Sequence, residues 1–214
     1  MKIFIIDYGA GNVESVFNAI KNIDPQINVK ISCDINEAKS STHFILPGVG
    51  AFGDCISGLK VTEGFLGEIR KQITKEKKPF LGICVGMQVL ASIGLENGEH
   101  QGLGFIDGRV EKITGKNSEG NYLKIPHMGW NNLIIKNFKH PILKTIIDGD
   151  HFYFANSYHF ICQNENNVIA QVQYGDNKIN ALISKDNIIG AQFHPEKSGE
   201  KGLQFLKNFI DWRP

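Results

Sequence analysis

The sequence predicts an α/β protein with a mostly parallel, doubly wound sheet, helices on both faces and an additional, largely antiparallel β portion. Its first half alternates short apolar runs with amphipathic stretches, which is typical of parallel strands joined by helices. After residue 88 the pattern changes to short segments rich in β-branched and aromatic residues, separated by glycine turns. With 214 residues, 42% of them hydrophobic, the chain can bury a full core, and we expect one domain spanning 1–214.

The first half is expected to alternate strand and helix. Residues 3–7 form an apolar run that predicts a buried strand, and residues 13–23 predict the helix after it. The glycine turn between them resembles a dinucleotide-binding fingerprint, but its third glycine would fall on Glu14, so we reject that function. The elements expected next are strands at 29–32 and 43–46, a glycine-rich turn at 47–53, a helix at 54–73, a charged turn at 75–78 and a strand at 80–83.

The second half is expected to be largely β. A helix beginning near Met87 is followed by glycine turns. Short strands are expected at 105–113, 129–135, 151–154, 168–173, 179–184 and 188–193. A short helix is expected at 142–147, and a last helix at 199–210 with Ser198 as its candidate cap and Leu203, Leu206 and Phe209 on one face.

Cys84 carries the clearest chemical signal. It lies between a buried strand and a helix, with Gly82 and Gly86 two residues away on either side, which is the spacing of a nucleophile elbow. Such a turn needs small residues because it is sharp and because the helix packs close to the strand. The sulfur would lie at a helix N-terminus, where free N–H groups favour a thiolate. The alternative is that Cys84 is a small buried hydrophobic residue, as most unpaired cysteines are.

A segment far along the chain favours the catalytic interpretation. His194 and Glu196 flank a proline, which biases the histidine toward extended backbone, where residues two apart face the same way. A carboxylate placed there can hold the imidazole tautomer and stabilise its protonated form, as the third member of a catalytic triad does. The glycine-rich turn at 47–53 follows a buried strand, and beside an elbow its Gly50 amide is expected to join the Val85 amide as an oxyanion donor.

Composition and charge exclude several function classes. The formal net charge of +1 gives no electrostatic reason to expect a nucleic-acid or membrane partner, and no apolar run approaches the roughly 20 residues of a transmembrane helix. The chain starts with a strand and not with a signal segment, so we expect a soluble, cytoplasmic protein. The four cysteines and seven histidines show no metal-ligand spacing, and we expect no metal, no cofactor and no disulfide framework.

The elbow, the glycine-rich turn and the His-Pro-Glu segment together resemble the class I glutamine amidotransferases, which use a Cys-His-Glu triad to release ammonia from glutamine. The resemblance covers essentially the whole chain. Within that family, four segments resemble the glutaminase subunit of imidazole glycerol phosphate synthase: residues 7–12, 46–52, 126–131 and 194–198. The elbow therefore indicates the superfamily, and these segments indicate the subfamily.

The resemblance implies a role for each residue of the site. Cys84 would attack the carboxamide carbon of L-glutamine, His194 would transfer protons, and Glu196 would orient the imidazole. The amides of Gly50 and Val85 would stabilise the oxyanion. The residues implied to hold the substrate are Gln88, Glu96, Ser157 and Tyr158, and those implied to line a partner interface are His127, Trp130 and Lys197. No essential role is expected for Asn156 or His159.

The resemblance also implies a heterodimer in histidine biosynthesis, in which ammonia passes to a separate (βα)₈-barrel cyclase subunit. This chain shows no phosphate-binding pattern for the ribonucleotide that such a subunit converts. The closest alternative is the same glutaminase chemistry supplying a different synthase, such as one in a sugar-modifying pathway. Two others remain: a deglycase- or peptidase-like enzyme, whose elbow cysteine is commonly followed by histidine and not by a residue like Val85, and a non-catalytic redox-sensing or scaffold protein.

Overall fold

A computed structural model describes residues 1–214, and its centre is an eight-stranded sheet. The strand order is β2-β1-β3-β4-β14-β13-β12-β9. The parallel strands are β2 (Asn28–Ser32), β1 (Lys2–Ile6), β3 (His43–Gly48), β4 (Phe80–Cys84) and β14 (Ile188–Ala191). The antiparallel strands at the other end are β13 (Asn177–Lys185), β12 (Val168–Tyr174) and β9 (Ile134–Ile135). The expected mostly parallel sheet is therefore confirmed.

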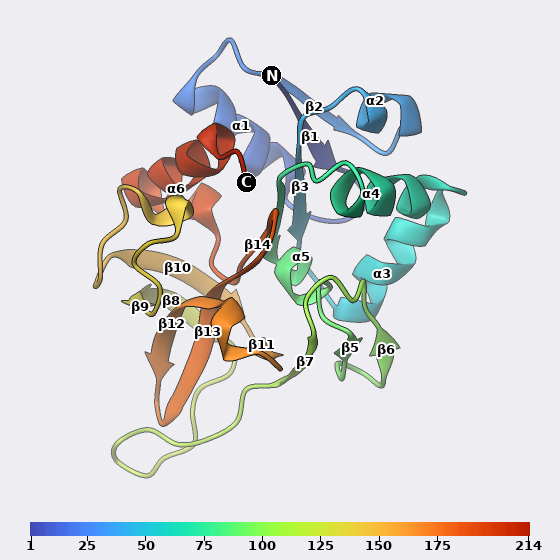
Figure 1. Ribbon diagram of the computed structural model, residues 1–214. Helices are drawn as coiled ribbons and strands as arrows, with labels where there is room; N and C mark the ends of the chain where they lie inside the picture. The colour runs from blue at the N-terminus through green and yellow to red at the C-terminus, as the bar shows by residue number, and fades with distance from the viewer.

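Helices cover both faces of this sheet, as crossovers between parallel strands require. On one face, α1 (Val13–Ile23) packs beside α6 (Gly199–Asp211) (Figure 1). The opposite face carries α2 (Ile35–Lys39), α3 (Phe52–Val61), α4 (Phe65–Thr74) and α5 (Val85–Gln88). No helix has both the length and the apolar character that crossing a membrane requires.

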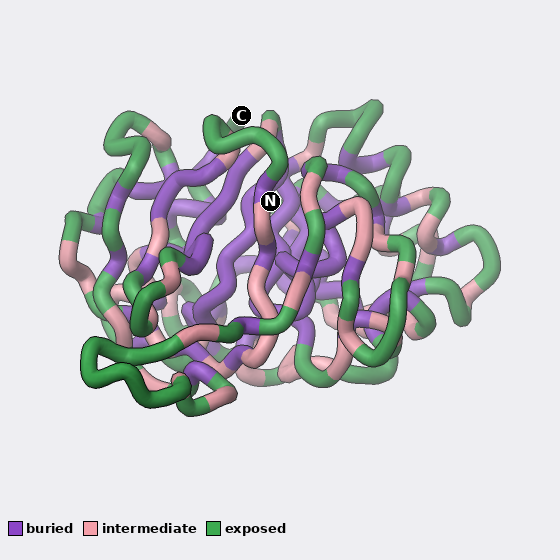
Figure 2. Tube along the Cα trace, turned by 90° about the horizontal axis from the view of Figure 1, so that it is seen from below, coloured by how far each residue is buried: buried purple, intermediate pink, exposed green.

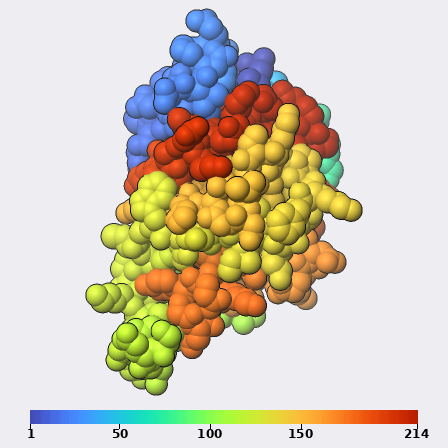
Figure 3. Space-filling view, turned by 90° about the vertical axis from the view of Figure 1, so that its left-hand side faces the viewer, coloured from blue at the N-terminus to red at the C-terminus, as the bar shows by residue number.

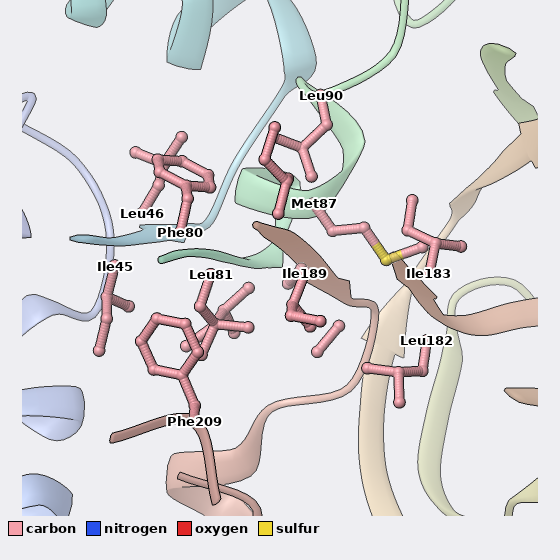
Figure 4. Packing of buried hydrophobic residues seen from close by; sticks show 14 of the residues in the cluster. Ile45, Leu46, Phe80, Leu81, Met87, Leu90, Leu182, Ile183, Ile189 and Phe209 are labelled. Carbon is pink, nitrogen blue, oxygen red and sulfur yellow. The ribbon is translucent and has the colours of Figure 1, made fainter. Parts of the chain in front are cut away.

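The buried core lies around the sheet, and the exposed residues lie mainly in loops and on outer helix faces (Figure 2). Phe80 lies on the same side of β4 as Met87, whereas the next residue, Leu81, lies on the opposite side with Phe209 of α6 (Figure 4). Because successive residues of a strand face opposite ways, a strand covered on both faces needs apolar residues at nearly every position. This explains why the central strands appear in the sequence as continuous apolar runs.

The antiparallel β portion extends beyond the central sheet. One small sheet pairs β10 (His151–Asn156) with β8 (His127–Asn132), and a second has the order β11-β7-β5-β6, formed by Tyr158–Cys162, Gly108–Lys112, Ile93–Gly94 and His100–Gln101. Three 3₁₀ helices lie in this half: η1 (Pro141–Leu143), η2 (Glu165–Asn167) and η3 (Pro195–Lys197). Figure 3 shows the yellow segment around residues 130–150 lying beside the red α6, with which η1 is in contact.

Several expected elements differ from those observed. The helix expected at 54–73 is two helices, α3 and α4, because the chain bends at Gly64, whose φ of +76 does not fit a helix. The helix expected from Met87 instead starts at Val85 and ends at Gln88, and the helix expected at 142–147 is only the single turn η1. The strands expected at 105–113 and 129–135 are shorter or split, and α2, β5, β6 and β11 had no prediction.

Candidate active site

The elbow forms at the end of β4. Cys84 has a φ of 54 and a ψ of −111, which few non-glycine residues adopt, and Val85 begins α5 immediately after it. Both flanking glycines are required by space: a Cβ on Gly82 would lie 2.3 Å from the carbonyl oxygen of Gly86, and one on Gly86 would lie 1.9 Å from the carbonyl oxygen of Leu46. The glycines therefore let the helix turn directly over the strand that carries the cysteine.

His194 reaches the same place from the neighbouring strand. It follows β14, which is paired in parallel with β4, and its backbone is extended, with φ −97 and ψ 95. Its Nδ1 lies 2.8 Å from Oε1 of Glu196, and the two side chains are only 5% and 2% exposed. The expected pairing of these side chains across the proline is confirmed.

The backbone of His194 is tied to β10 by a closed set of hydrogen bonds. The N–H of His194 donates to the carbonyl oxygen of Tyr153 at 2.9 Å, and the N–H of Tyr153 donates to Oγ of Ser198 at 3.0 Å. The Ser198 hydroxyl in turn donates to the carbonyl oxygen of His194 at 2.6 Å. Ser198 therefore holds the histidine, and it makes no side-chain cap for α6, which corrects the role expected for it.

The surroundings of His194 favour its charged form. Burial lowers the pKa of His194, but the contacts with the Cys84 sulfur and with the Glu196 carboxylate raise it, to a net value of about 9. At neutral pH the imidazole is then protonated beside the sulfur. A group in this state can give a proton to a departing amine.

A cavity of about 300 Å³ opens at the carboxyl ends of β3 and β4, where parallel sheets bind ligands. The residue pairing of Gly48 with Cys84 brings the glycine-rich turn beside the elbow. The twelve lining residues are Val49, Gly50, Cys84, Val85, Gln88, Glu96, Ala155, Asn156, Ser157, Tyr158, His194 and Lys197. The structure thus brings together every residue expected to act in catalysis, oxyanion binding or substrate binding, with Glu196 behind His194.

Gln88 offers the cavity a hydrogen-bond acceptor. Its side chain is buried, and its Nε2 donates to the carbonyl oxygen of Tyr158 and to Oε1 of Gln192, both at 3.0 Å. Because an amide nitrogen has two hydrogens, both are used in these bonds. Only Oε1 of Gln88 remains for a ligand, so this residue can accept a hydrogen bond from a substrate N–H.

Glu96 lines the cavity and also binds the end of the glycine-rich turn. One carboxylate oxygen accepts a hydrogen bond of 2.7 Å from the backbone N–H of Phe52, at the start of α3. An acidic group near a helix N-terminus is favourably placed there. Glu96 therefore anchors the end of the turn that carries Gly50, and its second oxygen is left for a ligand.

Two residues of the site were not expected from the sequence. Gln192 is fully buried, and its Nε2 lies 3.6 Å from the Cys84 sulfur. Asn156, for which no essential role was expected, lines the cavity and donates through Nδ2 to the carbonyl oxygen of Tyr158 at 2.9 Å. The only signal in the sequence for Gln192 is a polar residue within an apolar strand-like run.

The three residues expected at a partner interface do not share one environment. Trp130 is 57% exposed and packs edge-on against Tyr153, and Lys197 is exposed at the cavity rim. His127, in contrast, is only 3% exposed, and its ring is stacked 4.1 Å from Tyr174. Aromatic packing turns the His127 side chain inward, and burial lowers its pKa to about 4. That His127 lines a partner interface stays a prediction.

The site has no group of side chains suited to a metal. Nowhere in the chain do three or more His, Cys, Asp or Glu side chains gather in a way that could hold an ion. All four cysteines are free, and Cys84 is the one that lines the cavity.

Comparison with known proteins gives consistent matches over the full chain. Residues 4–212 match the family model of class I glutamine amidotransferases. The chain is 43% identical over 222 residues to the imidazole glycerol phosphate synthase subunit HisH of Bradyrhizobium diazoefficiens, with 100% of both chains covered. It is 39% identical to the protein of that name from Pelagibacter ubique, with 99% of this chain and 100% of the relative covered.

Solved structures resemble it at lower identity and support the fold. A glutamine amidotransferase superposes with a TM-score of 0.70 at 20% identity, covering 97% of this chain and 98% of the other. PurLQS from Thermotoga maritima gives a TM-score of 0.66 at 19% identity, covering 98% of this chain and 97% of the chain compared.

Proposed function

The chain belongs to the class I glutamine amidotransferases, and on that premise we propose that it is the glutaminase subunit of an imidazole glycerol phosphate synthase. The single observation that carries the chemistry is the elbow cysteine in one cavity with His194, whose Nδ1 is held 2.8 Å from Glu196. A nucleophile, a base and an orienting carboxylate in this order are what acyl transfer from a carboxamide requires.

The first half of the proposed reaction forms a thioester. The Cys84 thiolate attacks the carboxamide carbon of glutamine, and the carbonyl π electrons move to oxygen. The backbone N–H groups of Val85 and Gly50, residues of the same cavity, stabilise that oxyanion. When the intermediate collapses, the C–N bond breaks and the protonated His194 gives its proton to the leaving nitrogen, so ammonia departs and the γ-glutamyl thioester remains.

The second half hydrolyses the thioester. His194, now neutral, takes a proton from a water molecule as the water oxygen bonds to the thioester carbon. The C–S bond then breaks, its electron pair stays on sulfur, and glutamate leaves. Throughout, Glu196 holds the Nδ1–H tautomer and stabilises the imidazolium, because its Oε1 accepts from that nitrogen. Gln88, Glu96, Ser157 and Tyr158 hold the substrate from the cavity wall.

The ammonia is passed to a cyclase subunit of (βα)₈-barrel fold, with which the chain forms a heterodimer in histidine biosynthesis. Trp130 and Lys197 contact that subunit, since both are exposed, Lys197 at the cavity and Trp130 against Tyr153 of β10. The protein works in the cytoplasm, where a reducing environment preserves the free thiol of Cys84.

Replacement of the nucleophile tests this function. Cys84→Ser should abolish glutamate formation from glutamine, because a serine hydroxyl is a far weaker nucleophile than a thiolate. The complex of the variant with its cyclase subunit should still make product when ammonia is supplied at high concentration. Cys33→Ser, which changes an exposed cysteine, is the matched control and should keep full activity. Glutaminase activity near that of the parent in Cys84→Ser would refute the assignment.

A further inference from the structure

Gln192 is a buried amide that the proposed mechanism does not yet use. It directly follows β14, and its backbone N–H donates to the carbonyl oxygen of Ala181 at 2.9 Å, which holds the residue at the end of the sheet. The side chain is 0% exposed. Burying an amide without hydrogen bonds is unfavourable, so the partners of this side chain define what it does.

The orientation of the Gln192 amide follows from its neighbours. The carbonyl oxygen of Tyr158 can only accept, so it fixes the nitrogen of Gln88, which donates to it at 3.0 Å. That nitrogen donates its second hydrogen to Oε1 of Gln192, also at 3.0 Å. With its oxygen committed to Gln88, Gln192 must turn its Nε2 to the other side, where the Cys84 sulfur lies 3.6 Å away.

We propose that Gln192 is a further catalytic residue, which donates a hydrogen bond to the Cys84 sulfur, and that Gln88 is the positioning residue that keeps its amide turned that way. The proposal deepens the glutaminase function and rests on it for its place in the reaction. A donor at this distance interacts more strongly with a thiolate than with an uncharged sulfur, because hydrogen bonds to charged groups are the stronger ones.

This contact acts at the two moments when sulfur carries charge. Before attack, it stabilises the thiolate beside the protonated His194. In the last step the C–S bond breaks and its electron pair returns to sulfur, and the same N–H stabilises the thiolate that leaves. Between these moments the sulfur is an uncharged thioester, and the donor contributes less. Gln192 thus acts on attack and on thioester breakdown, while the oxyanion amides act on the carbonyl oxygen.

Alkylation of Cys84 tests the contact without glutamine or a partner. Iodoacetamide reacts with thiolate, and its rate with Cys84 can be followed by mass spectrometry of the peptide that contains it. Gln192→Met, an apolar replacement of similar length, should slow the reaction at pH 7 about tenfold, since a hydrogen bond to a charged group typically contributes ~1.5 kcal/mol or more. Gln192→Glu should slow it at least as much, because a carboxylate repels the thiolate.

Two controls keep the result interpretable. Gln72→Met also replaces a buried glutamine, on α4 and outside the cavity, and should leave the rate unchanged. Folding is checked separately by thermal unfolding, which should match that of the parent, because unfolding would expose Cys84, now only 4% exposed, and would also remove the groups that favour its thiolate. The pH profile of alkylation should move to higher pH in Gln192→Met. An unshifted profile with the parent's rate would overturn the proposal.

The role of Gln88 is tested by combining variants. Gln88→Met should also slow alkylation, because it releases the Gln192 amide, and the double variant should be no slower than Gln192→Met alone. Additive effects would show that Gln88 does not act through Gln192. In glutamine hydrolysis, Gln192→Met should lower kcat by more than it raises KM. If the alkylation effects are found but the parent chain shows no glutaminase activity with the cyclase subunit and its ribonucleotide present, the proposed function is refuted and the contact between Gln192 and Cys84 stands.

Discussion

At the scale of single residues, the backbone angle of Cys84 determines what its sulfur can reach. A φ of 54 in a residue with a Cβ costs on the order of 1–3 kcal/mol, and such strain persists only where the surroundings enforce it. The close packing of β4 against α5 holds Cys84 at this backbone angle. Gly82 and Gly86 make that packing possible, because a side chain at either position would collide with the backbone. The fold therefore gives up some stability to hold the sulfur at the cavity, at the start of α5.

Glu196 is expected to stabilise the positive charge of the His194 imidazolium and to orient its ring. Glu196→Gln removes the carboxylate that stabilises the His194 imidazolium, so kcat should fall by about 10² or more while KM changes little, as seen for orienting residues in other triads. The pKa of His194 should fall from about 9 toward its ordinary value, which an NMR titration of the ring measures.

The same substitution has a consequence for stability against pH. Because the folded pKa of His194 is raised, its contribution to the free energy of unfolding is full below about 6.5, the unfolded value, and is lost as pH rises through about 9. Glu196→Gln should flatten stability over that window in chemical denaturation. A variant whose only defect is a higher KM would instead place Glu196 in substrate binding.

The role of a single residue can be predicted from the sequence when it depends on local spacing, and not when it depends on contacts with distant segments. Cys84, His194 and Glu196 are found by spacing along the chain, because an elbow and a pair across a proline are local geometries. Gln192 is not, because its partner Gln88 lies 104 residues from it in the sequence, and the Tyr158 carbonyl that orients Gln88 lies 70 residues from Gln88. These residues meet only in the folded protein. The inward position of the His127 side chain is not predictable for a related reason: it is set by stacking on Tyr174, which comes from another strand.

At the scale of elements, β8 and β10 form a ribbon that carries both a buried and an exposed aromatic face. Phe152 and Phe154 of β10 are fully buried, whereas Met128 and Trp130 of β8 are 65% and 57% exposed. Large exposed apolar side chains next to one another favour an interaction surface. This ribbon also provides the carbonyl oxygen of Tyr153 that holds His194, so a partner seated on it would lie close to the triad.

The exposed tryptophan is expected to serve binding more than folding. Trp130→Ala should weaken the complex with the cyclase subunit about 30-fold or more, as loss of an aromatic anchor typically does, with little change in Tm. Titration calorimetry and thermal unfolding measure the two effects. Tyr122→Ala, which removes a side chain that is 83% exposed on a different segment, is the matched control and should bind normally. A large drop in Tm with unchanged affinity would make Trp130 a structural residue.

The strands and helices of the first half of the chain can be predicted from the local sequence pattern better than those of the second half. Buried strands β1, β3 and β4 stand out because both faces are covered, whereas β5 and β6 have two residues each and owe their pairing to neighbours distant in sequence. The break between α3 and α4 depends on one residue, Gly64. A single glycine also occurs within helices, so its presence in a helical sequence pattern does not predict a break. The place of β14 in the parallel sheet, beside β4, is set by topology, and no local pattern reveals it.

At the scale of the whole molecule, the site lies where the parallel sheet meets the antiparallel portion. The nucleophile and the glycine-rich turn come from the parallel part, through β4 and β3, while Asn156, Ser157 and Tyr158 come from the smaller sheets. A partner that binds the β8–β10 ribbon therefore contacts one wall of the cavity. This arrangement allows binding at the surface to change the geometry of the site.

Coupling between partner and active site is expected through the glycine-rich turn. Gly50 has a φ of +89, which glycine adopts freely, so the peptide that carries its amide can change orientation at little conformational cost. A donor turned away from the oxyanion forfeits about 10²–10³ in rate, a typical loss for one oxyanion hydrogen bond. The isolated chain should accordingly be a poor glutaminase, which prevents glutamine from being consumed when no acceptor is present.

Three measurements of glutamate production test this coupling: the chain alone, with the cyclase subunit, and with that subunit and its ribonucleotide. Turnover should rise at each step, by about 10²–10³ overall if one donor is restored. Gly50→Ala should lower the fully activated rate toward that of the isolated chain, because a side chain at a φ of +89 is strained and restricts the turn. Gly67→Ala, at an open position within α4, is the matched control and should be activated like the parent. Equal turnover in all three conditions would remove Gly50 as a switch and leave the oxyanion donors permanently in place.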